Sequence, residues 1–174
     1  MGSGEARSSV AEHKAHAPRT VRCVVCTISD SKTPETDTSG QLLQDLLRGA
    51  GHEVVGYHLV RDEPSQVHGV IHAACTDPAV QAVIFTGGTG ITSRDQTFEA
   101  IEALLEKRLP GFGELFRMLS YQEIGPAALL SRAQAGVRAG RLLFSLPGSP
   151  AACRLAIERL ILPELPHMVR EVNR

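Results

Sequence analysis

Short apolar runs alternate along the chain with segments in which apolar residues recur at helical spacing. The runs that predict strands are Arg22–Ile28, Glu53–Val60, Val80–Phe85, Ala133–Val137 and Leu142–Leu146. Strands that are buried on both faces and alternate with helices are typical of a parallel sheet covered on both sides. We therefore expect an α/β fold in which helices cover both faces of a doubly wound, mostly parallel sheet, giving three layers.

The segments between the strands predict helices, because their apolar residues recur every three or four positions. The predicted helices carry Leu42–Leu47, follow Pro64, carry Phe98–Leu105, and span Leu109–Ile124 and Pro150–Val172. Gly140 lies between the last two strands and suits a hairpin or a tight crossover. Ligands of such sheets bind beyond the carboxyl ends of the strands, so we expect the functional residues just after strands.

Composition excludes several classes of protein. The 174 residues carry 18 Lys and Arg against 19 Asp and Glu, a formal net charge of −1, and 43% of them are hydrophobic. No apolar run reaches the roughly 18 residues that a membrane span needs, and the balanced charge lacks the basic surface typical of a nucleic-acid binder. We expect no membrane and no nucleic-acid partner. A single domain is predicted over residues 20–174 and a disordered arm over residues 1–19.

The cysteines indicate a reduced, cytoplasmic protein, because four of them scattered over this length do not form a disulfide framework. Cys23 and Cys26 form a C-x-x-C pair inside a predicted strand, where residues three apart face opposite sides. A buried strand is therefore favoured over zinc or redox chemistry. His68 and His72 lie four apart in a predicted helix without a third metal ligand nearby in sequence, and we interpret them as exposed helix residues.

The strongest local signal is Thr86–Gly90, with the sequence T-G-G-T-G, where an apolar strand gives way to a helix. Its glycines expose backbone N–H groups without obstruction by Cβ atoms, and the following helix adds the positive end of its dipole. The loop therefore suits a polyanion. Its spacing matches neither the dinucleotide-binding nor the P-loop glycine pattern, and a plain strand-to-helix turn is the alternative.

A second loop of this kind, Pro147–Pro150, follows the last strand and opens the last helix. Ser149 is a natural N-cap and Pro150 a natural first helical residue. Helix capping explains the loop without a ligand and is the favoured interpretation of this motif on its own, although the two roles are compatible.

A third loop is unusually polar. It contains Ser29–Ser31 and Asp37–Gly40, and it joins the first strand to the first helix. Asp37 or Ser39 can serve as the cap of that helix. The loop is also expected at the same sheet edge as the glycine loop, where its side chains could donate and accept hydrogen bonds with a polar substrate.

Two carboxylates follow strands as well: Asp62 after the second strand, and Asp95 after the glycine loop and beside Arg94. Each would repel a phosphate by about 4 kcal/mol at a separation of about 4 Å and an effective dielectric constant of about 20. Such a site makes sense when a divalent cation lies between the charges, and Mg²⁺ is the usual choice. The structural alternatives are a helix cap for Asp95 and a turn residue for Asp62.

The segment Leu109–Ile124 carries more apolar surface than one helical stripe can bury in its own core. We interpret the surplus as a subunit interface. The alternative is a helix wedged deep inside the monomer.

Taken together, these motifs resemble in order the MoaB/MogA family of molybdenum cofactor biosynthesis, over the chain from about residue 21 to its end. The motifs are Ser29–Ser31, Asp37–Gly40, the glycine loop with Arg94–Asp95, Gly111–Ser120, Ser131–Arg132 and Pro147–Ser149. The phenylalanine-rich segment is similar to the MoaB branch rather than to MogA.

The resemblance implies that the terminal phosphate of molybdopterin attacks the α-phosphate of Mg-ATP, which yields adenylylated molybdopterin and pyrophosphate. Asp62 and Asp95 lie 33 residues apart and match the family's two catalytic aspartates, which would hold or position Mg²⁺. Arg61–Glu63 departs from the more usual valine-proline-aspartate sequence at this point.

The residues assigned to the ATP phosphates are Gly87, Gly88, Thr89 and Gly90, with Arg94 as a supplementary cation. Those assigned to the pterin or its phosphate are Ser29, Asp30, Ser39, Ser131, Pro147, Gly148 and Ser149.

The resemblance also implies molybdopterin as the ligand, a homo-oligomer that is a trimer or a hexamer, and a downstream molybdate-insertion protein as a partner. Some members of the MoaB branch lack the two acids, whereas this chain has both. The first alternative is a carrier or assembly protein that binds the pterin without catalysis. A further alternative is hydrolysis of a nucleotide pyrophosphate bond, because a related domain occurs in competence-damage proteins.

Overall fold

A six-stranded sheet forms the middle layer of the computed structural model, which describes residues 17–174. Its strand order is β2-β1-β3-β6-β5-β4. The strands are β1 (Arg22–Ile28), β2 (Glu53–Val60), β3 (Ala82–Thr86), β4 (Lys107–Arg108), β5 (Gln134–Arg138) and β6 (Arg141–Leu146). The first four in space are parallel, whereas β5 runs antiparallel to β6 and β4 antiparallel to β5. The expected mostly parallel sheet is confirmed.

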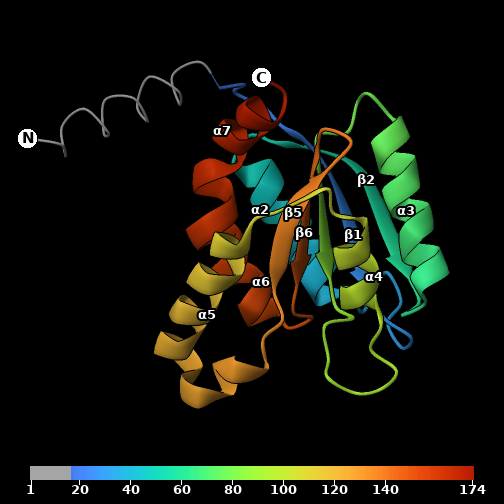
Figure 1. Cartoon of the computed structure of the whole chain (residues 1–174), viewed down its shortest axis with the longest axis vertical. Helices are drawn as coiled ribbons and strands as arrows, with labels where there is room; N and C mark the ends of the chain where they lie inside the picture. Colours follow the sequence, from blue (N-terminus) through green and yellow to red (C-terminus); the bar gives the residue numbers. More distant parts are fainter. Residues whose placement is uncertain (1–16) are drawn as a thin grey trace, which may run out of the picture.

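Helices cover both faces of this sheet (Figure 1). They are α2 (Thr38–Gly49), α3 (Pro64–Thr76), α4 (Thr97–Leu104), α5 (Pro110–Ile124), the 3₁₀ helix η1 (Gly125–Leu130), α6 (Pro150–Ala156), the π-helical turn η2 (Ile157–Ile161) and α7 (Leu162–Val172). The core on one face contains residues of α2, α5, α6 and α7, and the core on the other contains residues of α3 and α4. The three layers are those expected of a doubly wound fold.

The two cysteines of the C-x-x-C pair lie in different cores, Cys23 under α2, α5, α6 and α7 and Cys26 under α3 and α4. Burial raises the pKa of each thiol to about 12. Both thiols are therefore protonated at neutral pH. Because the two side chains point to opposite faces of the sheet, they cannot bind one metal ion together.

His68 and His72 are exposed on α3, as expected. Within residues 17–174 no group of three His, Cys, Asp or Glu side chains is placed to hold a metal ion.

Several boundaries differ from the sequence prediction. Strand β3 begins at Ala82 rather than Val80, because the amide of Val80 closes a turn onto the carbonyl of Asp77 (3.2 Å). Strand β4 was not predicted, because its two residues are both charged and exposed. At Gly140 the predicted hairpin forms, and Ala139 and Gly140 both have positive φ, as a two-residue hairpin turn requires.

The last predicted helix is interrupted by the π turn η2. Pro163 stands at the start of α7 and Pro166 lies inside it. Neither can donate a backbone hydrogen bond, so the regular series of α-helical hydrogen bonds is interrupted before them.

None of the helices in the described part of the chain is long and apolar enough to cross a membrane. The predicted arm lies outside the described residues except for residues 17–19.

Candidate functional site

The carboxyl ends of four parallel strands lie abreast, since Ile28 pairs with Val60, Thr27 with Thr86, and Thr86 with Leu146. The loops that follow these strands contain most of the predicted site residues. They meet at the lower edge of the sheet in Figure 1, the edge away from the C-terminus. The topology therefore brings the three loops and Asp62 together, as expected for a sheet of this class.

Direct hydrogen bonds join the last of these loops to the polar loop and to the glycine loop. The hydroxyl of Ser39, which is fully buried, donates to the carbonyl oxygen of Gly148 (2.7 Å). The hydroxyl of Thr86 donates to the carbonyl of Pro147 (3.1 Å). Ser39 and Gly148 thus connect the loops inside the protein, and their predicted contact with the pterin stays a prediction. Ser29 accepts hydrogen bonds from the amides of Ser31 (3.3 Å) and Lys32 (3.2 Å), which shapes the start of the polar loop.

A buried carboxylate anchors the polar loop. Asp37 is the N-cap of α2 and accepts a hydrogen bond from the amide of Gly40 (3.0 Å). The phenol of Tyr57 donates to the same carboxylate (2.7 Å), and the ammonium of Lys32 lies 3.5 Å from it. Burial acts to raise the pKa of Asp37, but these groups and the nearby hydroxyl of Thr27 outweigh it and hold the pKa below its ordinary value. Asp37 is therefore ionised in the folded protein at neutral pH.

We expect Asp37→Asn to lower the free energy of unfolding at pH 7 by about 1 to 3 kcal/mol, because it leaves the partners of a buried carboxylate unsatisfied. The lowered pKa of Asp37 contributes stability that is present at neutral pH and is lost as the pH falls below about 4. Urea unfolding at pH 7 and between pH 5 and 3 measures both effects, and the variant should show a shallower acid loss. Asp45→Asn, on the exposed side of α2, is the control. Equal acid profiles for the wild type and Asp37→Asn would contradict this role.

The glycine loop turns sharply at its first two glycines. Gly87 has φ +96° and Gly88 has φ +66°. A Cβ at Gly87 would stand well under 3.0 Å from the carbonyl oxygen of Ile28, and one at Gly88 would press on Thr97. Glycine is thus required at both positions by the protein's own backbone. The amide of Gly87 donates to the carbonyl of Leu146 (3.0 Å), so this amide is already used within the sheet edge.

The next amides of the loop are unused. Among residues 17–174 the backbone N–H groups of Gly88, Thr89, Gly90 and Ile91 donate to no protein acceptor. The amide of Gly87 already donates to Leu146, so the phosphate contact predicted for Gly87 has no free backbone donor here and stays a prediction. The available amides run from Gly88 to Ile91, one residue further along than the sequence indicated.

Arg132 supports this loop through two of its carbonyl groups, a role that was not predicted from the sequence. Its Nε donates to the carbonyl of Thr89 (3.1 Å) and its Nη2 donates to the carbonyl of Gly90. Its Nη1 is paired with Glu99 of α4, and the guanidinium carbon lies 4.7 Å from the centre of the Phe98 ring. The only sequence signal was its place directly after Ser131 in a family motif.

Asp62 lies at one end of the site. Its Oδ1 accepts a hydrogen bond from the hydroxyl of Thr97 at the start of α4, and its amide donates to Oδ1 of Asp30 (3.2 Å). Arg94 reaches Oδ2 of Asp30 at 3.5 Å, an exposed contact that contributes little by itself. The structure thus joins Asp30, Asp62 and Arg94 across three loops.

Asp95 is held within the glycine loop. Its Oδ2 accepts hydrogen bonds from the amide of Thr92 (2.8 Å) and from the hydroxyl of the same residue. These donors lower the pKa of Asp95, so its carboxylate is charged at neutral pH. The carboxylate lies so close to Gly90 that a Cβ there would stand under 3.0 Å from it. Asp95 is not the cap of α4, which begins after Gln96 without a side-chain cap. No hydrogen bond or ion pair between described residues joins Asp95 to Asp62.

A small hollow of about 210 Å³ adjoins the glycine loop at Thr89. Its lining brings together four predicted residues, Thr89, Ser131, Pro147 and Ser149, with apolar side chains of α5 and η1. Ser149 caps α6 by accepting from the amide of Ala152 (3.2 Å), which confirms the structural interpretation of that motif. Neither Asp62 nor Asp95 lines this hollow, which adjoins the glycine loop through Thr89.

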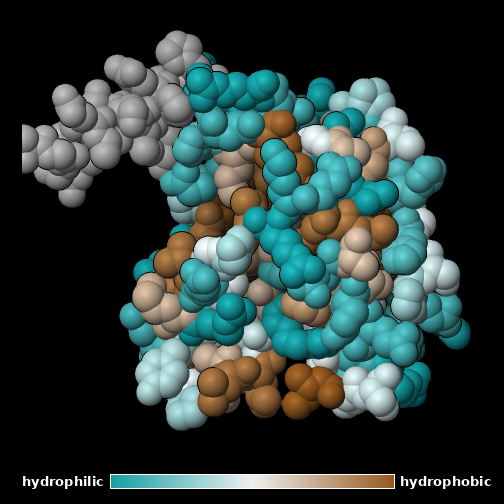
Figure 2. Space-filling view, viewed as in Figure 1, coloured by the Kyte–Doolittle hydropathy of each residue, from teal (hydrophilic) through white to brown (hydrophobic). Residues whose placement is uncertain are grey.

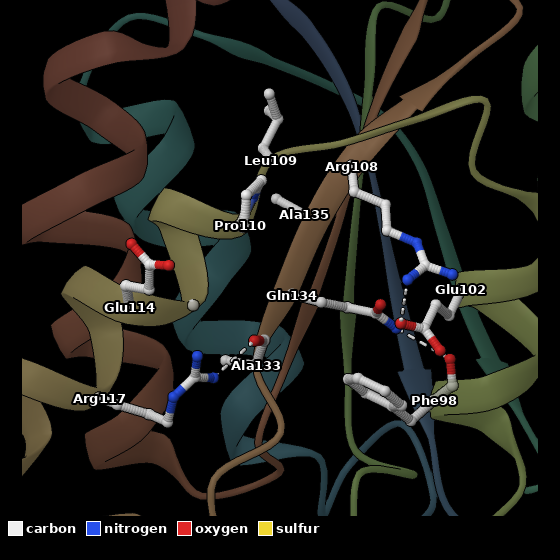
Figure 3. Close-up of a pocket in the computed structure, with 11 residues that line it drawn as sticks. Phe98, Glu102, Arg108, Leu109, Pro110, Glu114, Arg117, Ala133, Gln134 and Ala135 are labelled. Atoms are coloured by element: carbon white, nitrogen blue, oxygen red, sulfur yellow. Dashed lines mark hydrogen bonds and ion pairs between the residues drawn. The ribbon is translucent and has the colours of Figure 1, made fainter.

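A separate hollow of about 230 Å³ lies between α4, α5 and β5 and contains none of the predicted residues (Figure 3). Four of its polar side chains have partners. Arg108 pairs with Glu102 (3.2 Å), Gln134 donates to the carbonyl of Phe98 (2.8 Å), and Arg117 reaches the carbonyl of Ala133 (3.5 Å). This hollow is thus a poorer candidate for the site than the strand-end loops.

A model of the family described as a probable molybdopterin binding domain matches residues 24–167. The chain belongs to this family. It is 51% identical over 165 residues to molybdenum cofactor biosynthesis protein B of Halalkalibacterium halodurans, covering 94% of this chain and 97% of that protein. This places it closer to the B proteins than to a solved MogA, to which it is 26% identical with a TM-score of 0.75 over 87% of this chain and 99% of that one.

Solved structures of the family share the fold. The crystal structure of a molybdenum cofactor biosynthesis protein B has a TM-score of 0.88 and 51% identity, covering 91% of this chain and 99% of that one. The tungsten cofactor synthesizing protein MoaB from Pyrococcus furiosus has a TM-score of 0.82 and 37% identity, covering 91% of this chain and all of that one. The resemblance expected from the motifs is confirmed.

Proposed function

We propose that this protein acts in molybdenum cofactor biosynthesis as a molybdopterin adenylyltransferase that uses Mg-ATP. Its membership of a family of probable molybdopterin binding domains and its relatives named molybdenum cofactor biosynthesis protein B support the pathway. The observation that carries the reaction type is local: the carboxylate of Asp95 lies against Gly90, beside backbone amides that have no acceptor among residues 17–174.

Backbone N–H donors and the carboxylate of Asp95 lie side by side in this loop. This combination suits a nucleotide that carries a metal ion better than it suits an anion without one. Unused amides bind phosphate oxygens, while a carboxylate at the same position repels them unless a cation lies between. Asp62 and Asp95 each engage one carboxylate oxygen in a hydrogen bond to a threonine, which leaves the other oxygen available. Mg²⁺ is bound by one or two carboxylates together with phosphate oxygens and water, so these residues fit the metal that ATP carries.

In the proposed reaction an oxygen of the terminal phosphate of molybdopterin attacks the α-phosphorus of ATP. The bond from that phosphorus to the oxygen bridging the α- and β-phosphates breaks, and pyrophosphate leaves. Both reactants are anions, so the protein's task is to neutralise charge and align the groups. The chain's own residues divide this task, with the amides of Gly88–Ile91 for the triphosphate and Asp62 and Asp95 for its metal.

The hollow of about 210 Å³ beside Thr89 is the place we propose for the pterin. It adjoins the loop through Thr89, and its lining combines the hydroxyls of Ser131 and Ser149 with apolar side chains. A pterin ring is flat and carries polar edges, which such a mixed lining suits. The two reactants would then bind at neighbouring residues of one loop, the pterin beside Thr89 and the nucleotide beside Gly90 and Asp95.

The test is release of pyrophosphate from ATP and Mg²⁺ in the presence of purified molybdopterin. We expect release that depends on molybdopterin and matches the amount of adenylylated product. A carrier without catalysis would bind molybdopterin and release no pyrophosphate. Steady hydrolysis of ATP or ADP-ribose without molybdopterin would instead favour the hydrolase alternative, and either result would contradict the proposal.

We also propose that the protein is a homo-oligomer, because the apolar surplus of α5 is exposed in the single chain. Leu115, Met118, Tyr121, Ile124, Leu129 and Leu130 are between 49% and 84% exposed, and we call them the α5–η1 patch. Figure 2 shows apolar residues gathered over the lower end of the molecule. Six large apolar side chains left in water favour association with a second copy.

Leu129→Asp is expected to shift the protein toward monomer at micromolar concentration, because it buries a charge in the interface. Light scattering measures the mass of both proteins. The control is Val55→Asp on β2, which is 44% exposed and outside the patch and should keep the wild-type mass. A wild-type protein that is already a monomer would show that the patch serves another purpose.

A further inference from the structure

We propose that Arg132 is a positioning residue, which turns the amide N–H groups of Gly90 and Ile91 away from the protein and so prepares them for the nucleotide phosphates. This inference rests on the proposed function for the identity of the nucleotide. It assigns the residue that orients the phosphate donors, and it selects two amides of the loop as the principal ones.

The contacts of Arg132 reach both consecutive carbonyls at the centre of the loop. Nε donates to the carbonyl of Thr89 (3.1 Å) and Nη2 to that of Gly90. The side chain is only 24% exposed, and the ring of Phe98 lies 4.7 Å from its guanidinium carbon. A planar guanidinium with fixed donors can hold two carbonyls at once, which a lysine ammonium on a flexible stem cannot do as rigidly.

The direction of the amides follows from the covalent geometry of the peptide. The described residues contain no cis peptide bond. In a trans peptide the C=O and N–H groups point in opposite directions. The carbonyl of Thr89 shares its peptide with the amide of Gly90, and the carbonyl of Gly90 shares its peptide with the amide of Ile91. Because both carbonyls face Arg132, both amides face away from it.

Arg132 itself is poorly suited to bind a phosphate. Its Nη1 is paired with the carboxylate of Glu99, which neutralises its charge. Burial acts to raise the pKa of Glu99, but the hydrogen bond and the charge of Arg132 outweigh it and lower the pKa, so the pair is ionised at neutral pH. Glu99 and the two carbonyls together engage all three nitrogen atoms of the guanidinium. Arg132 therefore affects phosphate binding indirectly, because it orients the loop amides that contact the phosphate.

The experiment is titration calorimetry of Mg-ATP, without molybdopterin, into the wild type, Arg132→Met, Arg132→Lys and Arg138→Met. Arg138 is the matched control, because it also donates to a main-chain carbonyl, that of Leu104 (2.8 Å), but does not touch the glycine loop. We expect Arg132→Met to raise the Kd at least tenfold, Arg132→Lys to recover little of the loss, and Arg138→Met to leave the Kd unchanged. Full recovery by lysine would show that charge alone matters and would overturn the positioning role, as would equal affinity of Arg132→Met and the wild type.

A measurement on the wild type keeps the inference testable if an Arg132 variant does not fold. In amide-resolved NMR spectra, addition of Mg-ATP should shift the resonances of Gly90 and Ile91 more than that of Gly87, whose amide is bonded to Leu146. The reverse order would overturn the inference. Both measurements report binding rather than turnover. Absence of pyrophosphate release would therefore refute the proposed reaction and leave these results standing, whereas wrong amide shifts would refute only the role of Arg132.

Discussion

Asp95→Asn is expected to lower the rate of pyrophosphate release on the order of 100-fold, which corresponds to about 2.7 kcal/mol of activation free energy. The substitution removes the charge that lies against Gly90 but keeps a side chain of the same shape, which can still accept from Thr92. The loss should therefore fall on turnover and leave the fold intact. Initial rates at saturating ATP and molybdopterin measure it, together with thermal unfolding of the same samples.

Asp45→Asn is the matched control for that experiment, because it removes an exposed carboxylate of α2 that lies outside the glycine loop. It should leave turnover within a factor of two. Unchanged turnover in Asp95→Asn would remove Asp95 from the chemistry. A fall in both variants would indicate a general effect of charge on the reaction.

Gly87→Ala is expected to destabilise the folded protein by about 3 kcal/mol, since it combines the cost of a positive φ with a clash against a backbone atom. A Cβ at this position would overlap the carbonyl oxygen of Ile28, which belongs to the neighbouring strand and cannot move aside cheaply. For a chain of this size the melting temperature should fall by roughly 6 to 12 °C. Thermal or urea unfolding without ligand measures the effect.

The comparison variant is Gly69→Ala, in the middle of α3, where a Cβ meets nothing within 4 Å. It should stabilise the protein by about 0.5 to 1 kcal/mol through helix propensity. A Gly87→Ala protein as stable as the wild type would show that the glycine is needed for a ligand rather than by the Ile28 carbonyl.

The fold could be predicted well from the sequence, because buried apolar residues recur at the spacing typical of a helix or of a strand in each element. Both β1 and β2 have the predicted bounds, and Cys23 and Cys26 face opposite cores as the spacing of residues on a strand requires. The two elements that were not predicted, β4 and η2, have local explanations. Strand β4 has two charged, exposed residues and therefore no apolar signal, and the π turn η2 depends on prolines that also occur at ordinary helix starts.

The candidate site could be predicted only as a set of loops. The order of strands at the sheet edge follows from the alternation of strands and helices, so the meeting of Asp62 with Asp30 was within reach of the sequence. The use of the Gly87 amide by Leu146 and the support from Arg132 were not. Both depend on contacts between residues more than 40 positions apart, which no local pattern of apolar and polar residues encodes.

In the proposed reaction the amides of the glycine loop, next to Asp95, bind the triphosphate of a metal nucleotide. Crystals soaked with ATP and magnesium test it most directly. We predict triphosphate density against Gly88–Ile91, with the metal ion between the phosphates and the carboxylates of Asp62 and Asp95. Triphosphate density at any other place on the protein would contradict the account.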